Sequence, residues 1–224
     1  MSALSVSEAV ATRRSIRAFL DQPVDEAILR RVLEKARMAP SSTNLQPWRG
    51  VILAGRPLAD LSAALLAADP ASQPEYPLSA PETPAHFIAR REAIMAERMD
   101  ALGIAREDKE GRAAYNRKNY EFFGAPACLF TFVPRVLSPA HWASTALWLQ
   151  TVMLLLVEEG LGSCPQESLA HFPLPIKQVC GIDDGEYFFW CGLAIGWPDP
   201  AAPVNRYARP RVPLEESVSF RGFA

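Results

Sequence analysis

The pattern of apolar and polar positions predicts a helix-rich chain with few strands. The clearest helix begins at Asp25, where apolar side chains recur every three or four residues to Ala36 and charged side chains fill the opposite face. Because helical and strand patterns do not alternate regularly, the predicted fold class is α+β. Further helical patterns cover residues 5–13, 58–68, 87–102, 108–122 and 138–159. Apolar runs typical of buried strands cover residues 51–53, 127–133 and 187–196.

Proline-rich stretches interrupt this pattern without dividing it into domains. Residues 69–84 contain five prolines and predict an extended loop. Residues 197–224 are rich in proline and arginine and predict an extended C-terminal tail. The elements on either side of the first stretch are too short to fold alone, and the sequence has no internal repeat. We therefore expect a single domain over residues 1–224.

Composition and charge narrow the functional classes. The 224 residues are 49% hydrophobic, with 23 basic and 25 acidic side chains and a formal net charge of −2. This balance argues against a disordered chain and against nucleic-acid binding through bulk charge. Residues 1–14 lack the apolar core of a signal peptide, and the apolar run 146–157 is too short to cross a bilayer. We expect a cytoplasmic protein with no membrane partner, in which this run is a helix covered by a large core or a partner subunit.

The cysteines and histidines show no metal or disulfide pattern. Cys128, Cys164, Cys180 and Cys191 have no C-x-x-C spacing, and the three histidines are scattered along the chain. So few cysteines in a chain of this length favour buried, reduced thiols. We expect no disulfide framework and no metal ligand among these residues.

Two arginine clusters offer candidate anion-binding chemistry. Residues 13–17 read Arg-Arg-Ser-Ile-Arg, and residues 209–211 read Arg-Pro-Arg. Guanidinium groups bind phosphate through paired hydrogen bonds, and a neighbouring hydroxyl adds a neutral donor. Solvated surface arginines would give the same pattern, so neither cluster alone is specific for a ligand.

A polar loop follows the amphipathic helix. Five hydroxyl or amide side chains lie close together there, namely Ser41, Ser42, Thr43, Asn44 and Gln46. Such side chains can bind a polyhydroxyl chain or the edge of a heterocycle, and they also satisfy backbone groups in ordinary turns. The abrupt return to an apolar strand after this loop favours the binding role.

These motifs, with later ones, resemble the FMN-dependent nitroreductase family. The resemblance covers nearly the whole chain and is weakest over residues 66–115, where members of the family vary most. The final segment is similar to the branch that reduces nitrobenzoates and nitroanilines. The matching motifs are Arg13–Arg17, Ala39–Trp48, Gly124–Pro126, Gly160–Gln166, Gly192–Gly196, Asp199–Asn205 and Arg209–Pro213.

The resemblance implies a small, mostly antiparallel central sheet flanked by helices, in an intertwined homodimer with a C-terminal extension. It also implies a tightly bound FMN. The FMN phosphate would be held by Arg13, Ser15, Arg209 and Arg211. The ribityl chain and the pyrimidine edge of the flavin would lie beside Arg14 and Arg17.

The remaining FMN contacts implied by the resemblance come from three other segments. The partner subunit would contribute Pro40, Ser41, Ser42 and Asn44. Asn119 would bind the polar edge of the flavin, with Asn116 and Lys118 as alternatives. The isoalloxazine would lie along Pro165, Gln166, Glu167 and Ser168, with a backbone N–H near Glu167 directed at flavin N5.

The resemblance further implies an NAD(P)H-dependent oxidoreductase that reduces a small nitroaromatic acceptor by ping-pong hydride transfer. The flavin would carry the chemistry, so no catalytic side chain is required. Reduction of a quinone, free flavin or an enone is an alternative within the same family. A flavin-binding or flavin-consuming protein of the same fold is another. The sequence has no separate nicotinamide-nucleotide motif that would distinguish NADH from NADPH.

Overall fold

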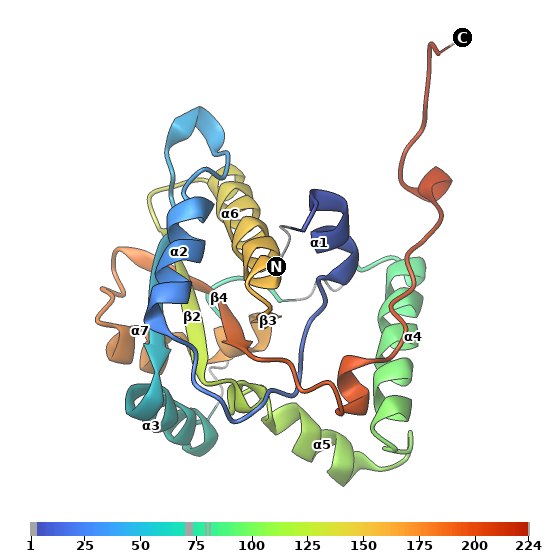
Figure 1. Cartoon of the computed structure of the whole chain (residues 1–224), viewed down its shortest axis with the longest axis horizontal. Helices are drawn as coiled ribbons and strands as arrows, with labels where there is room; N and C mark the ends of the chain where they lie inside the picture. The colour runs from blue at the N-terminus through green and yellow to red at the C-terminus, as the bar shows by residue number, and fades with distance from the viewer. Residues whose placement is uncertain (1–3, 70–73, 79, 81, 224) are drawn as a thin grey trace.

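The centre of the computed structural model is a four-stranded sheet (Figure 1). The structure describes residues 4–69, 74–78, 80 and 82–223. Across the sheet the order is β1-β2-β4-β3, and each neighbouring pair is antiparallel. The predicted α+β class and antiparallel sheet are therefore confirmed. The strands are β1 (Arg49–Ala54), β2 (Ala127–Pro134), β3 (Gly162–Gln166) and β4 (Tyr187–Gly196).

Seven α-helices flank this sheet among the described residues. Local sequence fixes several of their ends. Ser5 and Glu8 form a reciprocal capping box at the first helix, and the Asp25 side chain accepts from the N–H of Ala27 at the second. The helices are α1 (Val6–Thr12), α2 (Glu26–Ala36), α3 (Gly55–Ala67), α4 (Ala85–Ala101), α5 (Lys109–Arg117), α6 (Pro139–Glu158) and α7 (Pro173–Cys180).

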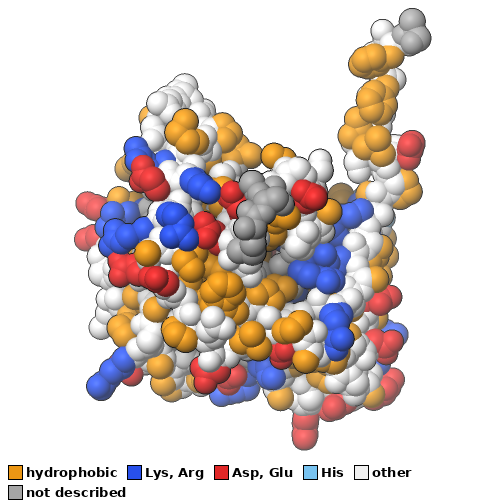
Figure 2. Space-filling view, viewed as in Figure 1, with side chains coloured by type: hydrophobic (Ala, Val, Ile, Leu, Met, Phe, Trp, Pro, Cys, Tyr) orange, Lys and Arg blue, Asp and Glu red, His pale blue; other side chains and the backbone are white. Residues whose placement is uncertain are grey.

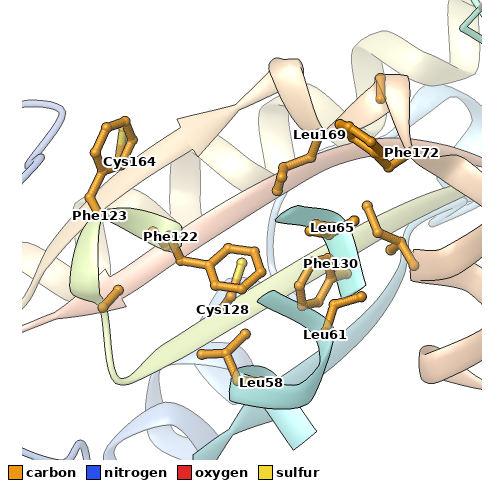
Figure 3. Packing of buried hydrophobic residues seen from close by; sticks show 14 of the residues in the cluster. Leu58, Leu61, Leu65, Phe122, Phe123, Cys128, Phe130, Cys164, Leu169 and Phe172 are labelled. Atoms are coloured by element: carbon orange, nitrogen blue, oxygen red, sulfur yellow. The ribbon is translucent and has the colours of Figure 1, made fainter. Parts of the chain in front are cut away.

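Strand β2 is buried along almost its whole length because helices cover both faces of the sheet. Cys128 and Phe130 belong to one buried cluster, which includes Leu61 of α3 (Figure 3). Ala127 and Leu129, which alternate with them, belong to a second buried cluster with residues of α2 and α6. Successive side chains of a strand point to opposite faces, so burial on both sides removes the usual apolar–polar alternation.

Three elements differ from the sequence prediction. Strand β3 was not predicted, because Gly-Ser-Cys-Pro-Gln has no apolar run. It lies at the sheet edge, where proline is tolerated. Helix α7 was also not predicted. Helix α5 ends at Arg117 and not at Phe122, since Phe122 and Phe123 adopt left-handed backbone conformations with φ of 51° and 56°.

Helix α6 lies in the core, although by length and composition it is the one described helix that could cross a membrane. Trp148 and Leu156 are buried, and Trp148 stacks on Trp48 with ring centroids 5.8 Å apart. Leu147 on another face remains 48% exposed. The helix was predicted to be covered on every side, and a single chain leaves one of its faces exposed.

The C-terminal segment leaves the body of the molecule. Beyond Asn205 it runs beside α4 and then projects outward (Figure 1). An ion pair of 2.8 Å joins Glu216 to Arg90 of α4. Farther along, Phe220 and Phe223 are 67% and 80% exposed. The apolar side chains at the end of this segment therefore lie in solvent in a single chain.

Candidate functional site

The two arginine clusters predicted from sequence meet in the structure. Ile16 N–H donates to the carbonyl oxygen of Ser163 at 2.9 Å, so the segment 13–17 is held against β3. From the other end of the chain, Arg209 NH1 donates to the carbonyl oxygen of Arg13 at 3.0 Å. Figure 2 shows Lys and Arg side chains gathered on the hollowed surface between α1 and α4. A single site is therefore assembled from residues almost two hundred positions apart.

Asn205 and Tyr207 hold the two segments together. Arg17 N–H donates to Asn205 Oδ1 at 2.8 Å, and the Asn205 amide donates to the carbonyl oxygen of Ala18 at 2.8 Å. Arg14 NH2 donates to the carbonyl oxygen of Tyr207 at 2.8 Å. Sequence reasoning had not assigned either residue a role, because the hydrogen bonds arise only from tertiary packing. A polar Asn beside the arginine-rich tail was the only local signal.

Positive charge accumulates at this site without compensation. Burial, followed by the neighbouring charges of Arg14, Arg13 and Arg211, lowers the pKa of Arg209 to about 10. Burial and then Arg211 lower the pKa of Arg13. Among the described residues, none of these four arginines forms an ion pair with a carboxylate. The cluster is therefore suited to an anion.

Three of the predicted site residues carry a buried polar atom that has no hydrogen-bond partner. The Nε of Arg209 is buried and has no hydrogen-bond partner. The Oε1 of Gln166 and the Oγ of Ser168, at and just beyond the end of β3, are likewise buried without partners. Buried polar groups normally find partners, so these three atoms are candidates for contact with a bound ligand.

Asn119 is the best placed of the three predicted amide or ammonium candidates. Its carbonyl oxygen accepts from Gln166 Nε2 at 2.7 Å, which joins the chain after α5 to the end of β3. Its side-chain amide donates to the carbonyl oxygen of Asn116 at 3.0 Å. Asn116 and Lys118 themselves are exposed. The geometry therefore favours Asn119 without excluding its neighbours.

Pro165 and Glu167 complete the predicted stretch along β3. Pro165 is half-buried, and Glu167 is exposed where the strand passes into a short 3-10 helix.

Burial raises the pKa of Cys191, on the neighbouring strand, to about 12 and also raises the pKa of Cys164. Both thiols are therefore protonated at neutral pH, and neither supplies a thiolate nucleophile.

The predicted polar loop lies elsewhere in the chain. Ser42 N–H donates to Ser144 Oγ of α6 at 3.1 Å, and Gln46 N–H donates to Ser41 Oγ at 3.0 Å. Figure 1 shows this loop at the end of α2, far from the tail and from α4. Thr43 and Asn44 have φ of 48° and 57°, an uncommon conformation that often marks functional loops. One chain does not bring Pro40, Ser41, Ser42 or Asn44 to the arginines.

Comparisons with known proteins match the chain to one protein family and to several reductases. A family model described as "Nitroreductase family" matches residues 10–197. The chain is 36% identical to a 4-nitrobenzoate reductase of Pseudomonas putida, covering 96% of this chain and 94% of that protein. It is 31% identical to a chloronitrobenzene nitroreductase of Comamonas testosteroni, covering 96% of each.

Two solved structures of nitroreductases are also similar to this chain. The FMN and NADPH-dependent nitroreductase NfnB from sphigopyxis sp. strain HMH matches with a TM-score of 0.92 and 43% identity, over 98% of this chain and 100% of that one. The FMN-dependent nitroreductase NfnB from Mycobacterium smegmatis, in complex with NADPH, matches with a TM-score of 0.90 and 28% identity, over 97% and 100%.

Proposed function

Because the chain belongs to the Nitroreductase family, we propose that it is an FMN-dependent enzyme that transfers hydride from NAD(P)H to a flat nitroaromatic acceptor. The observation that carries this proposal is the meeting of Arg13, Arg14, Arg209 and Arg211 without a carboxylate partner among the described residues. A phosphate monoester, with a charge of about −1.5 to −2, fits such a cluster.

Different residues of the protein would bind different parts of FMN. Arg13, Arg209 and Arg211, with the hydroxyl of Ser15, would bind the phosphate. Arg14 and Arg17 would lie beside the ribityl chain and pyrimidine edge. The unpartnered Gln166 Oε1 and Ser168 Oγ would take up polar groups of the ring system, with Asn119 beside them and Pro165 and Glu167 along its plane.

When bound, FMN supplies reversible two-electron chemistry at flavin N5. The protein's contribution is then to orient the cofactor, to exclude water and to place positive charge near the pyrimidine edge. Arg17 would take that last role, and its guanidinium lies over the Phe123 ring, 5.9 Å from the ring centroid. This division of labour needs no catalytic side chain, as the sequence predicts.

A homodimer completes the site in this proposal. The loop residues Pro40, Ser41, Ser42 and Asn44 lie far from the arginines of their own chain, so a second copy would supply them. Helix α2 and one face of β1 form a groove of about 680 Å³ with an apolar floor that includes Leu29 and Ile52. The exposed apolar tail of the other copy, including Phe220, would cover this groove.

The similarity to a 4-nitrobenzoate reductase and to a chloronitrobenzene nitroreductase supports a small nitroaromatic acceptor. The proposed setting is the cytoplasm, where NAD(P)H is available. No nucleic-acid partner and no membrane partner are part of the proposal, since the chain carries a formal net charge of only −2 and its most apolar helix lies in the core.

An absorption spectrum of the purified protein tests the function directly. We expect a flavin band that bleaches when NADPH is added anaerobically and returns when 4-nitrobenzoate is added. A flavin band that NADPH and NADH both leave unchanged would instead indicate a flavin-binding or flavin-consuming protein. A colourless protein that does not take up added FMN would contradict the proposed cofactor.

A further inference from the structure

A second pair of arginines converges beside the proposed phosphate site. Arg98 of α4 donates through Nε to the hydroxyl oxygen of Tyr207 at 3.3 Å. Arg17 donates through NH1 to the same oxygen at 3.2 Å. A phenol oxygen that accepts two hydrogen bonds directs its own O–H away from both donors, so Tyr207 can donate to a third group.

This pair has no negative partner within the described residues. Neither Arg17 nor Arg98 forms an ion pair there, although both are half-buried. Beside them the hydroxyl of Tyr115, whose residue is only 5% exposed, is buried without a hydrogen-bond partner. Two guanidinium groups sharing one neutral oxygen repel each other, and an anion between them would remove that repulsion.

The pair is separate from the cluster assigned to the cofactor phosphate. The phosphate is assigned to Arg13, Arg209 and Arg211, whose three positive charges already more than balance a dianion. Arg17 and Arg98 add two further positive charges on the other side of Tyr207, whose backbone carbonyl accepts from Arg14. Because Arg17 is also assigned to the pyrimidine edge of the flavin, Arg98 is the positive charge that remains for a second anion.

We propose that Arg98, together with Arg17 and the Tyr207 hydroxyl, forms an oxyanion subsite that binds a carboxylate on the aromatic acceptor. This inference rests on the proposed function. A planar guanidinium matches a carboxylate through two parallel hydrogen bonds, and the Tyr207 O–H supplies a third donor. Arg98 lies in the segment 66–115, so this subsite gives the chain its own preference among nitroaromatic acceptors.

Arg98→Gln tests this assignment, because it removes the charge and keeps a side chain able to hydrogen-bond. The matched control is Arg91→Gln, an exposed arginine on the same helix. In the FMN-loaded protein we expect R98Q to raise the KM for 4-nitrobenzoate relative to that for nitrobenzene by about tenfold or more, the effect of one charge-assisted hydrogen bond. R91Q is expected to leave this ratio as in the unmodified protein.

Benzoate binding supplies a readout that does not need turnover. Titration of the oxidised protein with benzoate, followed by the flavin absorption spectrum or by calorimetry, should give a dissociation constant that R98Q raises by a similar factor. Because no reduction occurs, this measurement still reports on the subsite if the proposed nitro reduction fails.

A third measurement, the flavin reduction potential, identifies the source of the anion. An unchanged potential with a raised benzoate dissociation constant supports the acceptor carboxylate. A lower potential in R98Q with no effect on benzoate would overturn that assignment and place the negative charge of reduced flavin at the subsite. No effect of R98Q on either quantity, beyond that of R91Q, would show that the pair binds neither anion.

Discussion

Arg209 lies among three other arginines, and no carboxylate in the described part of the chain forms an ion pair with any of them. The result is a pKa lowered to about 10, chiefly by burial, and a buried Nε without a partner. The buried guanidinium of Arg209 lowers the stability of the folded protein while the site is empty. Its free Nε gains a hydrogen bond only when an anion binds. Its role is therefore best measured through the ligand.

Arg209→Gln should weaken FMN binding selectively through the phosphate. Loss of a charge-assisted hydrogen bond is worth about 1.5–3 kcal/mol, which corresponds to a rise of about 10–100-fold in the FMN dissociation constant. Riboflavin lacks the phosphate, so its dissociation constant should change far less. Flavin fluorescence titration measures both ligands.

The matched control for R209Q is Arg56→Gln, since Arg56 is an exposed residue of α3 whose partner Asp60 is also exposed. We expect R56Q to leave both dissociation constants unchanged. An equal loss of FMN and riboflavin affinity in R209Q would mean that Arg209 contacts the ring or supports the fold and does not bind the phosphate.

At the scale of elements, the proline-rich segment between α3 and α4 is attached to the sheet by an ion cluster around the buried side chains of Lys177 and Glu75. Glu75 accepts from Lys177 Nζ at 2.5 Å and from the backbone N–H of Phe189 at 2.8 Å, and it also pairs with Arg135. The Lys177 side chain is only 2% exposed and has one other carboxylate, Asp184. This contact anchors the chain between α3 and α4 at Glu75.

Glu75→Ala should therefore destabilise the fold strongly. Removing one member of a buried ion pair costs about 3–5 kcal/mol, because the remaining charge loses its partner in a dry environment. Urea unfolding followed by circular dichroism measures this change, and Glu92→Ala on the exposed face of α4 serves as the control. A loss below about 1 kcal/mol in E75A would show that Asp184 alone compensates Lys177.

The same cluster gives stability a defined dependence on pH. Hydrogen bonding from Lys177, followed by its charge and that of Arg135, lowers the pKa of Asp184 below its ordinary value of 3.8. A carboxyl whose pKa is lowered by folding stabilises the folded state above its unfolded pKa, and this stabilisation disappears as pH falls through the folded value. Unfolding measured from pH 6 to pH 2 should show a smaller acid-induced loss in Asp184→Asn.

The sequence could predict elements whose signal is local, but it could not predict those that tertiary packing creates. The arginine motifs and the long helices follow from residue type and spacing. Strand β3 has no apolar run, and it is held by β4 and by the segment that contains Ile16. A methyl group added at Gly162 would lie 2.5 Å from Ile16 Cγ1, so the glycine permits this close crossing. Arg98 reaches Tyr207 across 109 positions, and no local pattern predicts such a contact.

At the scale of the whole molecule, several features are incomplete in one chain. The tail projects with Phe220 and Phe223 exposed, the groove beside the edge strand β1 has an apolar floor, and the polar loop 40–46 lies away from the arginines. A second copy related by a two-fold axis would cover the tail aromatics, fill the groove and bring the polar loop to the arginines. The same surfaces would be used on both chains. The dimer is therefore expected to be required for cofactor binding.

Replacing both tail aromatics, in Phe220→Ser/Phe223→Ser, should weaken the dimer and release FMN on dilution. Each large aromatic side chain removed from an apolar groove forfeits roughly 2 kcal/mol of burial, so the dimer dissociation constant should rise by at least about a hundredfold. Sedimentation velocity at several concentrations measures the oligomeric state, and filtration with the flavin spectrum measures retained FMN at each concentration.

Arg221→Gln is the matched control, because it changes a tail residue between the two aromatics without removing apolar surface. It should leave both the dimer and the bound flavin intact. Released flavin should follow the monomer fraction in the double variant, since the loop residues from 40 to 44 would separate from the arginines as the subunits part. A monomer that keeps its FMN would show that one chain suffices and that those loop residues do not contribute to the site.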